Sequence, residues 1–388
     1  MAIKEQTFGF FIPCETLMGI GCHKELGARI NSLGTKKPLL VTDEGMTKTG
    51  MVKQIADIIA KDIGITPVIY DKTVPNPTDL NVEEGLAVFK KNNCDMIITL
   101  GGGSAHDCGK GIGIVATNGG KINDYEGLDK SKNPMPPFIA INTTAGTASE
   151  MTRFCIITDT GRHIKMAIVD WHTTPTIAIN DPCLMVGMPP FLTACTGMDA
   201  LTHAVEAYVS TIATPVTDAC ALKAIELVSE YLRPAVANGS DMVARDKMAY
   251  AEYLAGMAFN NASLGYVHAM AHQLGGLYNL AHGMCNAILL PHVCRFNLIS
   301  KLERYADIAE VMGENIESIS TRDAAEVAIE SISILSQDVG IPSGLEELGV
   351  KPEDFDTMAK NAMKDACGAT NPRIPKLNDV IAIYKNAM

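Results

Sequence analysis

The order of strand-like and helix-like segments constrains the fold of this chain more than any other feature. In the first half, short apolar segments rich in β-branched residues alternate with longer amphipathic segments. We expect strands at residues 38–42, 67–70, 95–100 and 138–142, and helices at 51–63, 80–92 and from about 104 onward. This β-α-β-α order predicts a parallel sheet covered by helices.

The second half has a different pattern, because long helical periodicities replace the strand-like segments after residue 189. They cover residues 190–208, 215–238, 242–260 and 265–280 and continue to the end of the chain. We therefore expect an α/β domain at residues 1–185 and an all-α domain at residues 186–388. No low-complexity linker separates them, so we expect the two domains to pack around a cleft.

The composition excludes several classes of protein. Among 388 residues, 32 are basic and 44 acidic, and the formal net charge is −12. Nucleic acids and anionic membranes require a basic surface, so we expect neither as a partner. No segment resembles a signal peptide or approaches the roughly 18 apolar residues of a membrane span. Eleven cysteines without CxxC spacing are typical of reduced thiols, and we expect a cytoplasmic protein.

Four side chains of the second half have the composition and spacing of a metal site. Asp199 and His203 are one helical turn apart, so both project from the same face of a helix. His268 and His282 follow, and four of the nine histidines fall between positions 203 and 282. Three imidazoles and a carboxylate suit a divalent first-row metal, and the lack of CxxC spacing excludes a zinc finger. The alternative is that each histidine is a satisfied residue of the core.

A glycine-rich loop follows the strand expected at 95–100. Gly101, Gly102 and Gly103 precede Ser104, where a helix is expected to begin. Backbone N–H groups at such a turn form an anion site suited to a pyrophosphate, at the edge where open parallel sheets bind ligands. The motif is neither GxGxxG nor a Walker sequence, so an ordinary tight turn is the alternative.

Two further polar positions follow expected strands. The segment 143–150, TTAGTASE, carries hydroxyls that suit phosphate, ribose or carboxamide contacts, or else the capped start of a helix. Asp43 follows the strand expected at 38–42, where an acidic residue can bind the ribose of NAD and repel the 2′-phosphate of NADP. Asp43 is equally suited to be a turn residue.

Taken together, these motifs resemble the iron-containing (group III) alcohol dehydrogenase family over essentially the whole chain. The resemblance lies in GGGSAHDCGK at 101–110, TTAGTASEMT at 143–152, GMDALTHAVEAY at 197–208, NNASLGYVHAMAHQLGG at 260–276 and HGMCNAILLPH at 282–292. Within that family the chain is similar to bacterial NAD-linked ethanol and 1,3-propanediol dehydrogenases. It is also similar to methanol dehydrogenases and lactaldehyde-reducing members.

The resemblance implies residues for each part of the site. It implies that Fe(II), or Zn(II) as an alternative, is bound by Asp199, His203, His268 and His282. It implies NAD contacts from Asp43, Asn76, Gly101, Gly102, Gly103, Ser104, Thr143, Thr144, Thr147, Lys165, Leu184 and His272. It implies a substrate pocket walled by Phe154, Phe259 and Cys367, although both phenylalanines are equally suited to a core.

Two departures from the family pattern are visible. Ala105 and Ala281 stand where many relatives carry proline. Ala281 directly precedes His282, so we expect a looser loop at this position without the loss of a ligand.

The resemblance also implies the chemistry, which is reversible hydride transfer between NAD and a short-chain primary alcohol such as ethanol. Within the family, 1,3-propanediol, methanol and lactaldehyde are alternative substrates. His272 is the candidate catalytic residue, as a proton relay, because no carboxylate base is evident beside the site.

Two alternatives come from other functional classes. One is a metal-dependent lyase similar to dehydroquinate synthase, and the other is a non-catalytic scaffold that binds a metal or a nucleotide. The family resemblance further implies a homodimer or a higher homo-oligomer.

Overall fold

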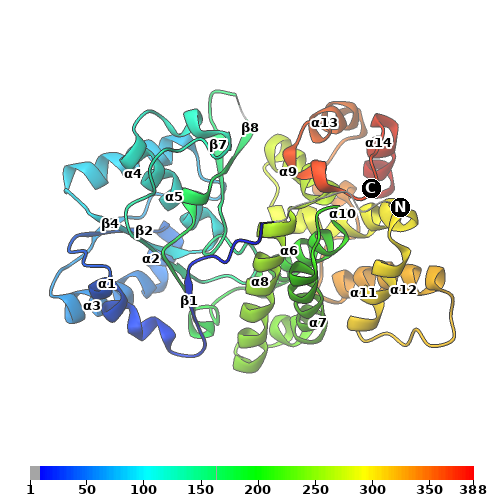
Figure 1. The fold of residues 1–388 in the computed structure, drawn as a ribbon, viewed down its shortest axis with the longest axis horizontal. Helices are drawn as coiled ribbons and strands as arrows, with labels where there is room; N and C mark the ends of the chain where they lie inside the picture. The colour runs from blue at the N-terminus through cyan, green and yellow to red at the C-terminus, as the bar shows by residue number, and fades with distance from the viewer. Residues whose placement is uncertain (1–8, 163) are drawn as a thin grey trace. The chain divides into compact units, whose positions relative to one another are not determined.

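A computed structural model describes residues 9–162 and 164–388. The chain divides into two compact units (Figure 1). One contains Pro13–Pro189 and Asn238–Ala249, and the other contains Pro190–Ala237 and Tyr250–Met388 together with residues 9–12. Each unit is described by itself below.

A six-stranded parallel sheet forms the centre of the first unit, as the sequence predicts. Its strands are β1 (Glu15–Met18), β2 (Pro38–Val41), β3 (Val68–Tyr70), β4 (Met96–Gly101), β6 (Phe138–Asn142) and β9 (Ile177–Asn180). They lie in the order β1-β9-β6-β4-β2-β3. Strands β2, β4, β6 and β9 are buried along their whole length, which explains why they read as continuous apolar segments.

Helices cover both faces of this sheet. Apolar side chains of α1 (Leu26–Ser32) and α3 (Met51–Ile63) pack in one core with Leu40 and Ile98. Those of α4 (Asp79–Lys91) and α5 (Gly103–Asn118) pack in a second core with Leu39 and Ile97, on the opposite face, because neighbouring strand residues point to opposite sides. Short helix α2 (Glu44–Thr49) follows β2, and 3-10 turns η1 (Cys22–Glu25), η2 (Ile122–Tyr125), η3 (Trp171–Thr173) and η4 (Pro182–Leu184) complete the unit.

A second, smaller sheet belongs to the same unit and is not predicted from the sequence. It contains β5 (Gly127–Leu128), β7 (Phe154–Asp159) and β8 (Ile164–Val169), in the order β5-β8-β7. Strands β7 and β8 are antiparallel, and only alternate residues of β7 are buried. The segment 143–150 does not begin a helix, since it runs through bends and turns directly into β7, and the capped-helix alternative is wrong.

The second unit is helical in all its described elements, as expected. Its α-helices are α6 (Pro190–Val209), α7 (Pro215–Ala237), the part of α8 (Met242–Ala262) from Tyr250 onward, α9 (Tyr266–Tyr278), α10 (His282–Asn297), α11 (Leu302–Val311), α12 (Thr321–Asp338), α13 (Phe355–Ala362) and α14 (Leu377–Asn386). Its 3-10 turns are η5 (Leu298–Ser300), η6 (Leu345–Leu348), η7 (Pro352–Asp354) and η8 (Ala366–Thr370). Helix α10 packs against α6, α9 and α12 and so lies at the centre of the bundle.

The lengths of these helices do not indicate a membrane protein. Within residues 9–162 and 164–388, no helix combines the length and the hydropathy needed to cross a bilayer.

Candidate functional site

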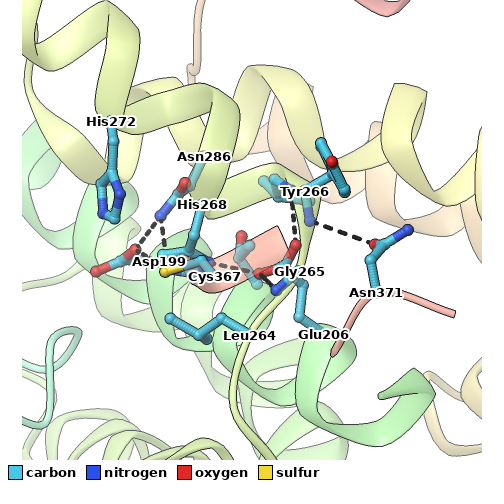
Figure 2. Close-up of polar contacts among 12 residues, drawn as sticks. Asp199, Glu206, Leu264, Gly265, Tyr266, His268, His272, Asn286, Cys367 and Asn371 are labelled. Atoms are coloured by element: carbon cyan, nitrogen blue, oxygen red, sulfur yellow. Dashed lines mark hydrogen bonds and ion pairs between the residues drawn. The ribbon is translucent and has the colours of Figure 1, made fainter. Parts of the chain in front are cut away.

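Three helices bring the predicted metal ligands together inside the helical unit. Asp199 comes from α6, His268 from α9, and His282 is the first residue of α10. Asp199 Oδ1 lies 3.9 Å from His268 Nε2 and 3.7 Å from His282 Nε2, and the three ligand atoms all lie within 4.8 Å of one another. Figure 2 shows Asp199 and His268 turned toward one another.

His203 lies beside this group, one turn after Asp199 on α6. Its ring stacks on His268, with centroids 4.6 Å apart, and on Phe259, with centroids 4.3 Å apart. The side chains of Asp199, His203 and His268 are all buried. The one-turn spacing of Asp199 and His203 therefore places both side chains on the face of α6 that contacts His268 of α9.

A glycine allows α10 to start close to α6. A Cβ on Gly283 would lie 2.3 Å from the carbonyl oxygen of Cys195 and 3.3 Å from Asp199 Cβ. Only glycine fits at such an approach. Helix α10 begins at His282, so this residue lies at the start of a helix rather than within a loop. Ala281 is the N-cap residue, and its side chain makes no capping hydrogen bond.

Two carboxylates support the histidines, and the sequence analysis missed both. Glu206 Oε2 lies 2.6 Å from His268 Nδ1, and this carboxylate also accepts hydrogen bonds from the backbone N–H groups of Gly265 and Val267 (Figure 2). Asp365 Oδ2 lies 2.8 Å from His272 Nδ1. The expectation that no carboxylate is evident beside the site is therefore wrong.

The two omissions have different causes. Glu206 lies two helical turns after Asp199, so helical spacing alone would have found it. Asp365 lies 93 residues after its partner His272, and no local pattern links the two.

The electrostatics of the group favour a bound cation. Burial holds the pKa of His268 well below its usual value, so this imidazole is neutral and keeps a lone pair on Nε2. Burial also raises the pKa of Glu206 to about 8, against the lowering effect of its backbone donors. A set of imidazole nitrogens and one carboxylate oxygen suits Fe²⁺ or Zn²⁺.

His272 and Cys367 form a second cluster around Asp365. The ligand-type atoms of these three residues all lie within 4.8 Å of one another, and the backbone N–H of Cys367 donates to Asp365 Oδ1. The rings of His272 and His282 stack with centroids 5.5 Å apart. Burial raises the pKa of Asp365, but the charge of His272 and the bonds from it and from Cys367 outweigh that effect, so the pKa of this carboxyl is lowered.

A buried amide, which the sequence analysis also missed, completes the group. The Asn286 side-chain nitrogen lies 2.6 Å from Asp199 Oδ1 and 3.1 Å from both His268 Nε2 and His282 Nε2. Asn286 is one turn after His282 on α10, so helical spacing could have indicated it.

In the sheet unit, the two polar loops lie side by side because their strands are in register. Gly101 of β4 pairs with Asn142 of β6, and the N–H of Thr143 donates to the carbonyl of Gly101 over 3.0 Å. A Cβ on Gly102 would lie 2.9 Å from the Thr144 side chain. One on Gly103 would lie 2.9 Å from the side chain of Thr147, so the glycines are needed for this close approach.

The remaining predicted NAD residues fall in four places. Asp43 caps α2, accepting a hydrogen bond from the N–H of Met46 over 2.9 Å, as a turn residue would. The Asn76 side-chain oxygen accepts a hydrogen bond from Lys165 Nζ over 2.8 Å, which joins two distant parts of the chain. Leu184 is buried in the core on the α1 and α3 face of the sheet. Ser104 lies in the first turn of α5.

The three predicted pocket residues do not all belong to one unit. Phe259 and Cys367 lie in the helical unit, where Phe259 covers the His203 ring. Phe154 lies in the sheet unit, at the start of β7, and its backbone carbonyl accepts a hydrogen bond from Lys110 Nζ over 2.7 Å.

Comparison with known proteins identifies relatives over the full length. Residues 13–182 match the model described as iron-containing alcohol dehydrogenase, and residues 193–388 match that of the C-terminal part of the Fe-containing alcohol dehydrogenase family. The chain is 57% identical to alcohol dehydrogenase 4 of Schizosaccharomyces pombe, over 98% of this chain and 89% of that protein. It is 52% identical to the NAD-dependent methanol dehydrogenase of Bacillus methanolicus, over 98% of this chain and 99% of that protein. A crystal structure of 1,3-propanediol oxidoreductase has a TM-score of 0.97 and 54% identity, over 99% of this chain and 100% of that one.

Proposed function

Because this chain belongs to the iron-containing alcohol dehydrogenase family, we propose that it transfers hydride reversibly between NAD and a short-chain primary alcohol. The observation that carries this proposal is the cluster of buried Asp199 and His268 with half-buried His282, beside His203. A cation bound there would supply Lewis-acid chemistry toward an alcohol oxygen, and bound NAD would accept the hydride.

The proposed metal-binding domain is residues 186–388. Asp199, His203, His268 and His282 would hold the cation through one oxygen and three nitrogens. Fe²⁺ is our first assignment, from the family, and Zn²⁺ is the alternative, because Zn²⁺ binds more tightly to a generic site of this kind. Glu206 would keep the Nδ1 proton of His268 in place and so direct Nε2 toward the cation.

The proposed NAD-binding domain is residues 1–185. The backbone N–H groups at the start of α5 would bind the pyrophosphate, with Thr144 and Thr147 packed against the glycines. Asp43 at the end of β2 would bind a ribose of NAD and disfavour NADP. Lys165, fixed by Asn76, would act near the nicotinamide ribose, as the family resemblance implies.

The proposed substrate is a small alcohol or its aldehyde, with ethanol as the first choice. The Phe259 ring lies flat on His203, and a bulky ring at this place leaves little room for a long chain. The named relatives support 1,3-propanediol and methanol as alternatives. His272, oriented by Asp365, is the proposed proton relay.

We also propose a cytoplasmic homodimer or higher homo-oligomer without nucleic-acid or membrane partners. The net charge of −12 supports the lack of nucleic-acid binding. All eleven cysteines lie in the described residues as free thiols, which supports a reducing compartment.

The decisive experiment is NADH formation by anaerobically Fe²⁺-loaded protein with primary alcohols from C2 to C8. We expect the highest kcat/KM for the shortest members and a much lower rate with NADP. The matched control is Asp199→Asn, which should lose the metal and NADH formation but keep NAD affinity.

Three outcomes would contradict parts of this proposal. Rates that rise steadily with chain length would overturn the small pocket. Loss of NAD binding in Asp199→Asn would contradict the separation of the two binding sets. If none of the alcohols gives NADH and no aldehyde is reduced, the dehydrogenase assignment is overturned in favour of a lyase or a scaffold.

A further inference from the structure

The side-chain amide of Asn286 lies at the point on which the proposed ligands converge. Its nitrogen is 2.6 Å from Asp199 Oδ1 and 3.1 Å from each of His268 Nε2 and His282 Nε2. Figure 2 shows the amide of Asn286 directed at Asp199. Each contact is short enough for a hydrogen bond in which the amide donates.

These three acceptor atoms are the ones that a cation would need. A neutral imidazole nitrogen has a single lone pair, so it cannot accept an N–H and bind a metal at the same time. Metal–nitrogen bonds are about 2.0–2.1 Å long. The three atoms that would bond a cation are thus the same three atoms that the amide nitrogen contacts. The amide and a cation exclude one another from this position.

No other interaction competes for the Asn286 side chain. The residue is fully buried, and its Oδ1 has no hydrogen-bond partner among residues 9–162 and 164–388. In a buried amide, both the nitrogen and the oxygen normally have hydrogen-bond partners. In Asn286, only the nitrogen, which faces the ligands, has them. The hydrogen bonds that orient this amide are thus those to the three ligand atoms.

We propose that Asn286 is a positioning residue that holds Asp199, His268 and His282 together until a cation displaces its amide. The inference rests on the metal site of the proposed function. The two N–H groups of Asn286 are shared among these three acceptors, and the two imidazole nitrogens could no longer accept them once they bind a cation. A group that stabilises the metal-free state more than the loaded state lowers the affinity for the metal. Asn286 therefore limits how tightly the site binds its cation.

The test is Asn286→Leu, a replacement of similar shape that neither donates nor ligates. Zn²⁺ and Co²⁺ affinities are measured by competition with a chromophoric chelator, and melting temperatures are measured with and without metal. We expect the metal-free variant to melt lower than the wild type and to bind both cations roughly tenfold more tightly, the equivalent of two lost neutral hydrogen bonds.

A control separates this effect from general destabilisation. Asn81 is also a buried amide, but it lies in the sheet unit, where its side chain bonds the Lys72 carbonyl and the N–H of Thr78. Asn81→Leu should lower the melting temperature and leave both metal affinities unchanged. If Asn286→Leu does not fold, Asn286→Ala should show the same tightening.

The remaining outcomes overturn one proposal or the other. An affinity in either Asn286 variant that equals the wild-type value shows that no amide is displaced, and a weaker affinity shows that Asn286 assists the bound cation. Both outcomes reject the inference and leave the metal site standing. If the wild-type protein binds no cation at all, the metal site itself is rejected, and the role of Asn286 with it.

Discussion

At the residue scale, two histidines of the site each have the Nδ1 nitrogen held by a carboxylate. Glu206 contacts His268, and Asp365 contacts His272, each through Nδ1 of the ring. Such contacts fix the tautomer and the angle of an imidazole, which leaves Nε2 free to act. Glu206 would orient His268 as a metal ligand, and Asp365 would orient His272 as a proton relay.

Replacement of His272 with Ala should lower kcat by about a hundredfold, because proton transfer by a positioned side chain contributes on this order. Asp365→Asn should cause a smaller loss, since it keeps the side-chain shape but not the charge that orients the ring. Metal content, measured by elemental analysis, should stay at the wild-type level in both variants. Unchanged turnover in His272→Ala would rule out the relay.

The sequence revealed the proposed ligands because their information is local. Asp199 and His203 are four residues apart, and helical geometry alone places them on one face. Asp365 could not be found in this way, because its contact with His272 depends on how the turn η8 packs against α9. Asn286 had the required spacing from His282, but an asparagine is not an expected ligand, and only the three distances show its importance.

At the element scale, the long helices and strands β2, β3, β4 and β6 are predicted from the sequence, whereas β1, β9 and the strands of the smaller sheet are not. Strands β2, β4 and β6 are buried on both faces, so each carries a continuous apolar segment. Strand β1 has four residues and pairs with β9, more than 150 residues later, so its pairing depends on the completed sheet. Strands β7 and β8 bury only alternate residues and depend on one another.

A buried ion network joins the glycine-loop helix to the segment that precedes β7. Lys110 of α5 donates from Nζ to the Ser149 hydroxyl and to the carbonyls of Thr152 and Phe154. The Ser149 hydroxyl donates to Asp107, also on α5. These hydrogen bonds therefore connect the two proposed NAD loops, in addition to the pairing of β4 with β6.

The turn that joins β7 to β8 should be sensitive to acid. Asp159 Oδ1 accepts the N–H groups of Gly161 and Arg162, and Oδ2 accepts from the Arg162 guanidinium, which lowers the pKa of Asp159 to about 2. Because this pKa lies below the usual value of 3.8, the stabilisation is complete above pH 3.8 and is lost as the pH falls toward 2. The wild type should therefore melt above Asp159→Asn at pH 5, and the difference should shrink toward zero at pH 2.

Arg162→Gln provides the control for this prediction. It removes the largest contribution to the lowered pKa, so the same loss should occur at a higher pH than in the wild type. A difference in melting temperature between wild type and Asp159→Asn that stays constant from pH 5 to pH 2 would show that Asp159 acts through its shape rather than its charge.

At the scale of the whole molecule, the proposed NAD contacts other than His272 lie in one unit and the proposed metal ligands lie in the other. Asp43, Asn76, the glycine loop, the threonines and Lys165 all lie in the sheet unit. The proposed metal ligands and their supporting carboxylates lie in the helical unit. In the sequence, the predicted strand-like segments end before residue 186, and all proposed metal ligands follow it.

Removal of the metal should therefore leave NAD binding intact. A bound metal stabilises the residues that hold it, which lie in the helical unit. Of the proposed NAD contacts, only His272 comes from that unit. In chelator-treated protein we expect the NAD dissociation constant, measured by calorimetry, to stay within roughly twofold of the wild-type value, while NADH formation stops. Added Zn²⁺ should raise the melting temperature of wild type but not of Asp199→Asn. A large loss of NAD affinity on chelation would instead mean that the metal or its ligands contribute directly to the cofactor site.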